Sequence, residues 1–365
     1  MIPLSIPDLR GREIEYLTRC VEDNWVSSAG PFVTELEERM AAICNCSHGV
    51  ATVNGTAALH LSLIGLGISP GDAVVVPDWT FAATANAVMH AGATPVLVDV
   101  NAENWTLDPQ CLHRALAGEE GRIKAIVAVH ALGHPADMDS ILEIAAVHGV
   151  PVIEDAAGAL GATYRGAPVG SFGAAAIFSF NGNKTVTAGS GGAIVTDDGV
   201  LADRMRHIST QARVSQDYRH DTVGYNYRMA NINAAIAVAQ LERMDEMIAA
   251  KRAIAARYDS AIRGRNDLEP MPRMNWAESC CWLYSVRTKS TEDADNLVDT
   301  LNEKGIQARK FWRSLSEQAP YAKSPTYANG VAGALGGRIV SLPCSSNLSQ
   351  ADQSIVIDAL DAWTG

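Results

Sequence analysis

One lysine, Lys184, lies in a short polar and glycine-rich segment between two apolar runs, residues 174–178 and 193–196. Both runs have the length and composition of buried strands. Lys184 belongs neither to a solvated helix face nor to a run of charges. We therefore expect its amine to be partly removed from water, which lowers the pKa and makes the amine nucleophilic. A lysine in a surface hairpin is the alternative that this stretch leaves open.

Two carboxylates, Glu154 and Asp155, end an apolar run that begins at Val150. Strand alternation directs their side chains to opposite sides of a sheet. Asp155 is suited to hold a protonated ring nitrogen, because an opposite charge nearby raises the pKa of such a nitrogen by about 1–3 units. The alternative is that Asp155 caps a following helix.

The sequence Asn54-Gly55-Thr56 joins a predicted strand, residues 49–53, to a predicted apolar helix, residues 57–66. A glycine turn at a helix start presents unpaired amides and the positive end of the helix dipole to an anion. The turn therefore indicates a phosphate site. A plain Asn-Gly turn with Thr56 as the helix cap is the alternative.

Apolar strands and helices alternate along the first part of the chain, which predicts a largely parallel sheet covered on both faces. Ligands of such sheets bind beyond the carboxyl ends of the strands, where Asp155 is expected. We expect an α/β protein with a large domain over residues 1–250, including an N-terminal helical segment, and a small C-terminal α/β domain over residues 251–365. The main predicted strands are 74–77, 94–98, 123–129, 150–155, 282–286 and 306–311; the main predicted helices are 8–23, 33–43, 82–91, 201–207, 231–249, 291–304 and 350–363.

Composition narrows the class of protein. The 365 residues are 47% hydrophobic and 19% charged, with a formal net charge of -12, which argues against nucleic acid or an anionic membrane as partner. The first ten residues do not resemble a signal peptide, and no apolar run approaches the roughly 20 residues of a membrane span, so we expect a cytoplasmic location. The seven cysteines are scattered without metal-ligand spacing, and we expect no metal site.

A phosphate site, an aromatic residue after a strand, a carboxylate at a strand end and a lysine together match what pyridoxal 5'-phosphate (PLP) requires of a protein. Phe81 is the aromatic residue, and the hydroxyl of Ser179 adds to the predicted phosphate site. The combination predicts a PLP site more strongly than any of its parts.

Over nearly its whole length the chain resembles the DegT/StrS family of PLP-dependent sugar aminotransferases, which have the aspartate aminotransferase fold (fold type I). The Trp-Val-Ser-Ser-Ala-Gly and Gly-His-Pro-Ala-Asp-Met motifs resemble the branch that aminates C4 of nucleotide-linked 4-keto-6-deoxy sugars on the way to bacillosamine and legionaminic acid. The motifs that carry the resemblance are residues 25–30, 54–59, 70–72, 76–84, 133–138, 153–157, 178–184 and 224–229.

The resemblance implies that Lys184 binds the cofactor aldehyde covalently and then moves the proton. It implies that Asp155 pairs with the pyridinium nitrogen and that Phe81 stacks on the ring. Because one phosphate ligand would come from the neighbouring subunit, the active unit is implied to be a homodimer with its active sites at the subunit interface. The implied phosphate ligands are Gly55, Thr56, Ser179 and the partner subunit's Asn226.

The implied reaction moves the amino group of L-glutamate to C4 of a nucleotide-linked 4-keto-6-deoxy (N-acetyl)hexose. Alternatives are a GDP-linked 4-keto sugar of the perosamine type, a keto or aldehyde sugar without a nucleotide, and a non-catalytic PLP-binding regulatory protein. Gly158 departs from the family pattern, because many members place glutamine, histidine or glutamate there, near the cofactor's phenolic oxygen. The candidate acceptor contacts are Trp25, Ser27, Ser28, Lys310, Trp312 and Arg313.

Overall fold

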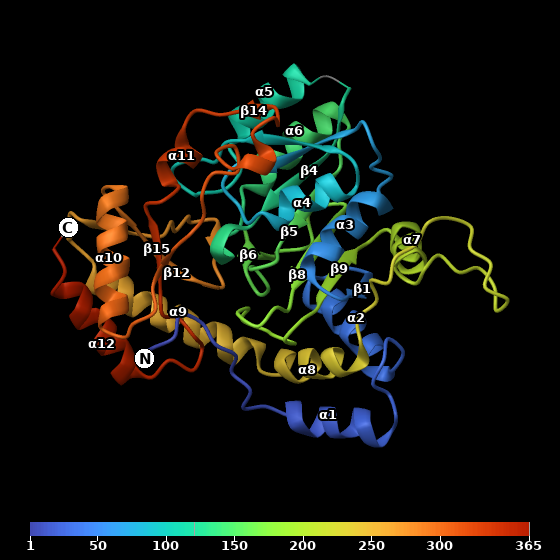
Figure 1. Cartoon of the computed structure of the whole chain (residues 1–365), viewed down its shortest axis with the longest axis horizontal. Coiled ribbons are helices and arrows are strands. Elements are labelled where there is room, and N and C mark those ends of the chain that lie inside the picture. The colour runs from blue at the N-terminus through green and yellow to red at the C-terminus, as the bar shows by residue number, and fades with distance from the viewer. Residues whose placement is uncertain (120, 365) are drawn as a thin grey trace.

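The computed structural model describes residues 1–119 and 121–364. Its largest sheet has eight strands (Figure 1). Across the sheet, the strands are β1 (His48–Thr52), β9 (Gly192–Thr196), β8 (Ala175–Ser179), β5 (Val152–Asp155), β4 (Ile123–Val129), β2 (Ala73–Pro77), β3 (Thr94–Val98) and β14 (Thr326–Tyr327). The six strands from β8 to β14 pair in parallel, and β9 is antiparallel to both β8 and β1. The predicted, largely parallel sheet is confirmed.

Helices cover both faces of this sheet because successive strand residues point to opposite sides. Val74 and Val76 of β2 pack in one hydrophobic cluster, whereas Val75 packs in another on the opposite face. The helices of the first face are α3 (Gly55–Gly65), α4 (Ala83–His90) and α7 (Gly199–Ser209). Those of the second face are α5 (Pro109–Gly118) and α6 (Met138–His148) and, farther along it, α2 (Pro31–Ile43) and α8 (Asn231–Leu241); α1 (Glu13–Glu22) packs on α8.

The helix predicted over residues 231–249 is wrong, because the chain breaks after α8 and restarts as α9 (Met244–Ala261). At the break, Glu242 accepts a hydrogen bond from the hydroxyl of Tyr16 (2.6 Å). The guanidinium of Arg243 lies 3.4 Å from the buried carboxylate of Asp8. The contacts that accompany this break come from the N-terminal segment, so the apolar pattern of the helix itself does not reveal it.

A smaller antiparallel sheet lies on the left of Figure 1, with two helices beside it. Its strands are β10 (Leu268–Pro270), β12 (Tyr284–Thr288), β15 (Ile339–Leu342) and β13 (Arg309–Lys310), and its helices are α10 (Thr291–Glu303) and α12 (Gln350–Asp361). The strand predicted over residues 306–311 is therefore only two residues long. The predicted domain boundary at residue 250 lies inside α9, and we propose this helix as the link between the two domains.

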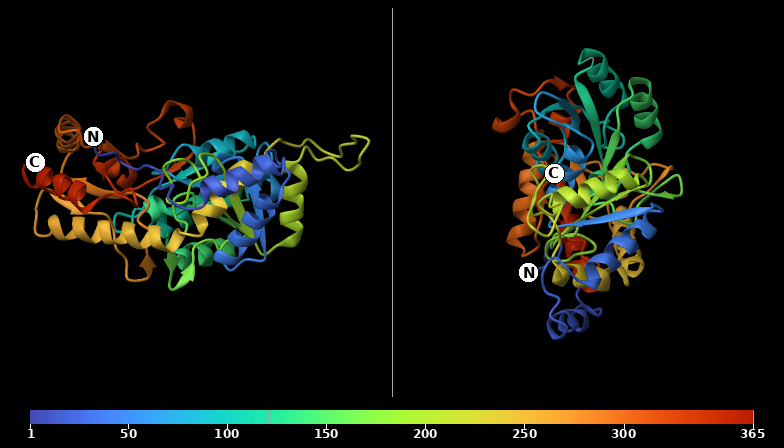
Figure 2. Two further views of the ribbon diagram at one scale, coloured as in Figure 1. Left: turned by 90° about the horizontal axis from the view of Figure 1, so that it is seen from below. Right: turned by 90° about the vertical axis from the view of Figure 1, so that its right-hand side faces the viewer.

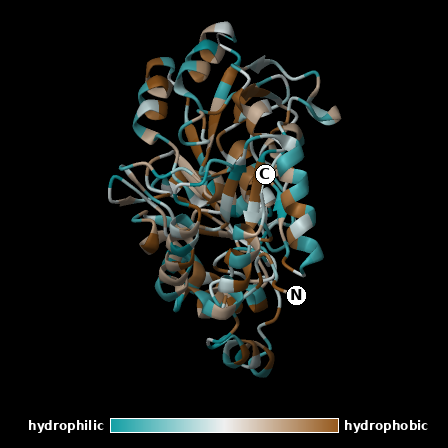
Figure 3. Ribbon diagram, turned by 90° about the vertical axis from the view of Figure 1, so that its left-hand side faces the viewer, coloured by the Kyte–Doolittle hydropathy of each residue, from teal (hydrophilic) through white to brown (hydrophobic). Residues whose placement is uncertain are grey.

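Hydrophobic residues are concentrated on the inner strands, which are brown in the ribbon of Figure 3. Short elements complete the described chain. The short elements are η1 (Ala131–Gly133), η2 (Ala319–Tyr321), α11 (Val331–Leu335) and a three-stranded sheet of β11 (Ala277–Glu278), β6 (Thr163–Tyr164) and β7 (Ala167–Pro168). None of the helices in residues 1–119 and 121–364 combines the length and hydropathy needed to cross a membrane.

Part of the C-terminal region returns to the large sheet, where β14 pairs with β3. Just beyond β3, the fully buried carboxylate of Asp99 accepts hydrogen bonds from four backbone amides. One amide follows it in sequence, and three belong to the segment that begins α11. The donors are Val100, Asn329, Val331 and Ala332, at 2.6–3.0 Å. Asp99 thus fixes residues 329–332 to the end of β3.

Asp99→Ala is expected to lower the free energy of unfolding by roughly 3–5 kcal/mol, because it leaves several buried N–H groups without an acceptor. Urea unfolding followed by circular dichroism measures the change. Asp358→Ala, which removes an exposed carboxylate of α12, is the control and should change the free energy by less than about 0.5 kcal/mol. Equal effects of the two substitutions would contradict the anchoring role.

Candidate active site

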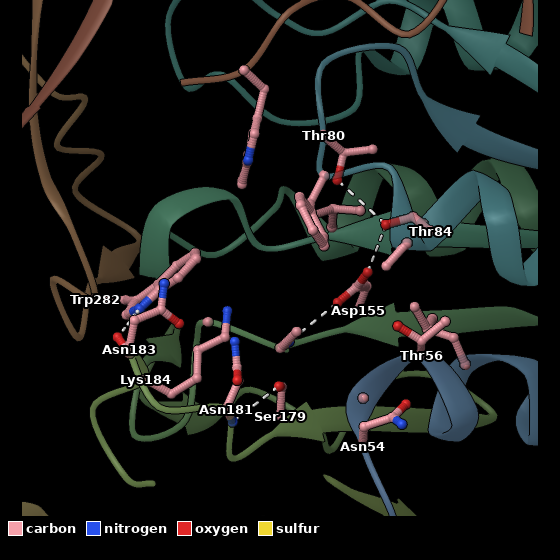
Figure 4. A pocket seen from close by; sticks show the side chains of 18 of the residues that line it. Asn54, Thr56, Thr80, Thr84, Asp155, Ser179, Asn181, Asn183, Lys184 and Trp282 are labelled. Atoms are coloured by element: carbon pink, nitrogen blue, oxygen red, sulfur yellow. Dashed lines mark hydrogen bonds between the residues drawn. The ribbon is translucent and has the colours of Figure 1, made fainter. Parts of the chain in front are cut away.

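A cavity of about 590 Å³ lies at the carboxyl ends of the parallel strands (Figure 4). Residues 309–312 form one of its walls. The structure brings together at this cavity every predicted cofactor-binding residue except Asn226, which was predicted to act from the neighbouring subunit. The predicted residues that line the cavity are Gly55, Thr56, Phe81, Asp155, Ser179 and Lys184.

Lys184 lies in the loop between β8 and β9, and this loop is folded against the protein. Its backbone amide donates to the carbonyl of Asn181 (2.9 Å), and the amide of Ala188 donates back to Phe180 (2.9 Å). Residues 185–188 are buried, so the surface-hairpin alternative is wrong. Burial lowers the pKa of the Lys184 amine to about 7, although the nearby charge of Asp155 acts in the opposite direction.

In the protein without bound ligand, acetylation of Lys184 by acetic anhydride is expected to rise with pH and to be half-maximal near pH 7. Below this pH the ammonium form does not react, and above it the neutral amine does. Peptide mass spectrometry measures the labelling, with the exposed Lys289 of the same digest as internal reference. A midpoint near that of a free lysine side chain, about 10.4, would show that burial does not control this amine.

Asp155 is the last residue of β5, and only 5% of it is exposed. The hydroxyl of Thr84 donates to Oδ2 (2.8 Å), and the amide of Ala157 donates to Oδ1 (3.1 Å). Turns rather than a helix follow Asp155, so the helix-cap alternative is wrong. Burial raises the pKa of this carboxyl, while the two hydrogen bonds and the charge of Lys184 favour its ionised form.

Glu154 points away from the cavity, as strand alternation predicted. Its carboxylate accepts hydrogen bonds from the amides of Gly170, Phe172 and Gly173 at 2.8–2.9 Å. It also accepts one from Nε2 of His130 (3.1 Å), whose other ring nitrogen accepts from the backbone of Ala136. These bonds lower the pKa of Glu154 against the effect of its burial. Glu154 therefore supports the strand ends that carry Asp155.

The start of α3 meets the end of β8 at the other end of the cavity. A side chain at Gly55 would place its Cβ 2.9 Å from the Cβ of Ser179, so this approach requires glycine. The helix cap is Asn54, whose side chain accepts from the amide of Ala57 (2.8 Å), and the alternative in which Thr56 caps the helix is wrong. The first amides of α3 and the hydroxyl of Ser179 provide a site for an anion.

Phe81 lies in the loop between β2 and α4. Its side chain borders the cavity and is not packed in the core. It is 62% exposed and lines the cavity, so its ring is available for stacking on a planar ligand. The aromatic residue predicted after a strand end therefore lines the cavity, and its stacking role stays a prediction.

The wall formed by residues 309–312, which we call the acceptor wall, is attached to the loop that follows β2 of the large sheet. The indole of Trp79 donates to the carbonyl of Trp312 (3.0 Å). Nearby, the carboxylate of Asp78 accepts from the amide of Ser316 (2.7 Å) and from two serine hydroxyls. Of the acceptor contacts predicted in this segment, Lys310 and Trp312 line the cavity, whereas Arg313 is exposed outside it. Lys310 also forms an ion pair with Asp295.

The other predicted acceptor contacts, Trp25, Ser27 and Ser28, lie outside the cavity that one chain forms. They belong to the loop between α1 and α2. In this loop the carbonyls of Trp25 and Ser27 accept from the side chain and backbone of Asn231, at 2.8 and 2.6 Å. Asn226 is exposed and also lies outside this cavity. Any contact of these residues with a ligand in such a cavity would have to be made in a second subunit.

Other residues at the cavity were not predicted from the sequence. Thr80 and Thr84 stand four residues apart, and this spacing could have marked them as neighbours around Asp155. Nothing in the sequence marks Trp282 as a residue of the site, because the pattern around it indicates only the start of a strand. The unpredicted polar and aromatic residues that line the cavity include Asn54, Thr80, Thr84, His130, Asn181, Asn183, Ser190, Trp282 and Arg309.

Sheet and cavity together define a PLP-dependent transferase of fold type I. The donor set fits this cofactor: a buried amine for its aldehyde, a buried carboxylate for its ring nitrogen, a helix start for its phosphate and an exposed ring for stacking. The Streptococcus pneumoniae protein Spr1654 in its PLP form superposes with a TM-score of 0.91 at 26% identity, over 100% of both chains.

The chain belongs to the DegT/DnrJ/EryC1/StrS aminotransferase family, whose model matches residues 7–361. It is 41% identical to the GDP-perosamine synthase of Caulobacter vibrioides over 99% of this chain and 97% of the relative. It is 37% identical to the GDP-perosamine synthase of Escherichia coli O157:H7, over 99% and 98%. The protein is therefore a PLP-dependent sugar aminotransferase, and the alternative of a non-catalytic regulatory protein is set aside.

Proposed function

We propose that this enzyme transfers the amino group of L-glutamate to C4 of a GDP-linked 4-keto-6-deoxy sugar. The observation that carries the proposal is the likeness, over 99% of the chain, to two enzymes named GDP-perosamine synthase. This likeness favours the GDP-linked alternative over the N-acetylhexose acceptor suggested by the sequence motifs.

The acceptor wall supports a nucleotide-linked substrate. Arg309 and Lys310 bring cationic groups to the cavity mouth, and Phe311 and Trp312 bring aromatic rings. The guanidinium of Arg309 lies 5.0 Å from the ring centre of Phe311. Cations bind the oxygens of a diphosphate, and aromatic rings stack on a base, so the wall has the chemistry that a nucleoside diphosphate needs.

Bound PLP supplies an electron sink that lets a proton leave the carbon next to the transferred nitrogen. In our proposal the amine of Lys184 would hold the aldehyde and would move that proton as a general base and acid. Asp155 would keep the ring nitrogen protonated, and Phe81 would stack on the ring. The amides of Gly55 and Thr56 and the hydroxyl of Ser179 would bind the phosphate.

We propose that the active unit is a homodimer in which the partner's Asn226 completes the phosphate site. Asn226 follows a hairpin that begins after α7 and extends away from the rest of the chain (Figure 2). This hairpin exposes three large apolar side chains, which a second subunit could cover. They are Val214, Tyr218 and Val223, with exposures of 54%, 72% and 78%.

Mixing two inactive variants tests the dimer. We expect Lys184→Ala and Asn226→Asp chains, unfolded and refolded together, to recover activity that neither regains alone. A mixed dimer contains one site with both Lys184 and the partner's Asn226 intact. Activity of refolded mixtures, compared with each variant refolded separately, is the measurement. No recovery, despite mixed dimers seen by native mass spectrometry, would mean that Asn226 does not act across the interface.

The function is tested in two stages. L-glutamate alone should convert the cofactor's absorbance to that of the pyridoxamine form. The converted enzyme should then be mixed with 4-keto-6-deoxy sugars linked to GDP, dTDP or UDP, and kcat/KM compared. The highest value with the GDP-linked sugar supports the proposal, whereas a higher value with a UDP-linked N-acetylhexose overturns it. Lack of conversion by glutamate would refute the proposed donor.

A further inference from the structure

The amine of Lys184 rests on the face of the Trp282 indole. Its Nζ lies 3.3 Å from the indole ring centre, and Figure 4 shows the two side chains next to each other at one side of the cavity. Trp282 is 6% exposed, although it lines the cavity. The indole therefore covers the side of the amine on which it lies and keeps water from that side.

Trp282 is held in place by polar contacts on its side chain and its backbone. Its indole N–H donates to the carbonyl of Asn183 (2.9 Å), the residue directly before Lys184. Its own carbonyl accepts from the buried amine of Lys251 (3.1 Å), which also donates to the carbonyl of Cys344 (2.7 Å). Because Lys251 belongs to α9, these contacts join the loop of Lys184 to the helix that leads into the small domain.

Gly158 provides the space that the indole occupies. A Cβ at this position would lie 2.3 Å from Cε3 and 2.9 Å from Cδ2 of Trp282. These atoms belong to a rigid ring system, so the indole cannot yield by moving a flexible end. The carbonyl of Gly158 also accepts a hydrogen bond from the thiol of Cys280 (3.2 Å), which holds the two segments together. The observed position of the Trp282 indole thus requires glycine at position 158.

We propose that Trp282, in the space left by Gly158, is a positioning residue for Lys184. Its indole face holds the amine at the cavity and excludes water from it, and its N–H fixes the carbonyl that precedes the lysine. This role rests on the proposed function only in taking Lys184 as the reacting amine. It also explains why position 158 has no side chain, because the indole of Trp282 occupies that space.

Two effects of the indole on Lys184 oppose each other. The ring face attracts an ammonium ion and so favours the charged form. Exclusion of water disfavours that form. Burial of the amine as a whole lowers the pKa of Lys184 to about 7, and we expect the indole to act mainly through its share of that burial. Loss of the indole should therefore make the amine harder to deprotonate.

The test is competitive acetylation of Lys184 in the full-length chain freed of PLP, with Lys289 as reference. Trp282→Ala is expected to raise the pH of half-maximal labelling by about 1–3 units. Gly158→Ala should produce a similar rise by displacing the indole. Trp282→Phe keeps an apolar ring and should give a smaller rise than Trp282→Ala. Circular dichroism and thermal unfolding confirm that each variant is folded.

The double variant Gly158→Ala/Trp282→Ala separates this role from general disruption. Once the indole is absent, the added methyl group has no ring to meet, so the double variant should label like Trp282→Ala alone. Additive shifts, or an unchanged labelling midpoint in folded Trp282→Ala or Trp282→Phe, would overturn the proposal. If Gly158→Ala does not fold, the two Trp282 variants still decide the question. Labelling needs neither donor nor acceptor, so an error in the proposed substrate would leave this result unchanged.

Discussion

Lys184→Ala is expected to abolish amino transfer, with a loss of more than about 10⁴-fold in kcat, because in the proposed function one side chain both holds the cofactor and moves the proton. The amine of Lys184 lines the cavity, and burial lowers its pKa to about 7, so much of it is neutral near neutral pH. The variant should also lose the absorbance band of lysine-bound PLP. Both the glutamate half-reaction and full turnover measure the effect.

Two controls make this result specific to the amine. Lys184→Arg keeps a positive charge but removes the nucleophile, so it should be as inactive as Lys184→Ala. Lys289→Ala, which removes an exposed lysine, should leave kcat unchanged. Appreciable turnover by either Lys184 variant, measured in a preparation free of wild-type enzyme, would contradict the assignment of Lys184.

Asp155→Asn is expected to lower kcat on the order of 10²–10³-fold, since it removes a buried negative charge that stabilises positive charge on the bound ring. Asparagine has nearly the same size and can still accept the hydrogen bond of Thr84, so the substitution tests the charge more than the packing. The glutamate half-reaction, followed by rapid-mixing absorbance, measures the loss directly. PLP retention on dialysis should also decrease.

A variant of the neighbouring hydroxyl provides the comparison. Thr84→Ser keeps the group that donates to Asp155 and should retain most of the activity. Thr84→Val removes the donor and should reduce activity less than Asp155→Asn, because the amide of Ala157 still donates to the carboxylate. A half-reaction rate for Asp155→Asn close to that of the wild type would show that the charge is not required.

The sequence was informative where local pattern and chemistry coincide. The apolar strands and the polar residues that end them predicted the large sheet and the positions of Asp155 and Lys184. Alternation also predicted the opposite direction of Glu154. These features depend on residues close together in the chain, and for that reason they can be read without knowledge of distant contacts.

The features missed from the sequence depend on contacts between distant segments. The break between α8 and α9 involves Tyr16 and Asp8, and no local signal marks it. Trp282 reaches the site because Gly158 leaves space for it, and neither residue alone indicates the other. The homodimer, the role of Asn226 and the acceptor remain predictions, because they depend on contacts with a second subunit and with ligands.

The attachment of the acceptor wall has a consequence for engineering. Asp78 and Asp99 hold the segments that follow the wall. Asp99 accepts only from backbone amides there, whereas Asp78 accepts from one amide and from the hydroxyls of Ser314 and Ser316, and all of these donors lie outside residues 309–313. Side chains at 309–313 can therefore be exchanged without removing these anchors. If the acceptor wall binds the sugar nucleotide as proposed, grafting this five-residue segment from relatives with other acceptors would change the acceptor and leave Lys184 in place.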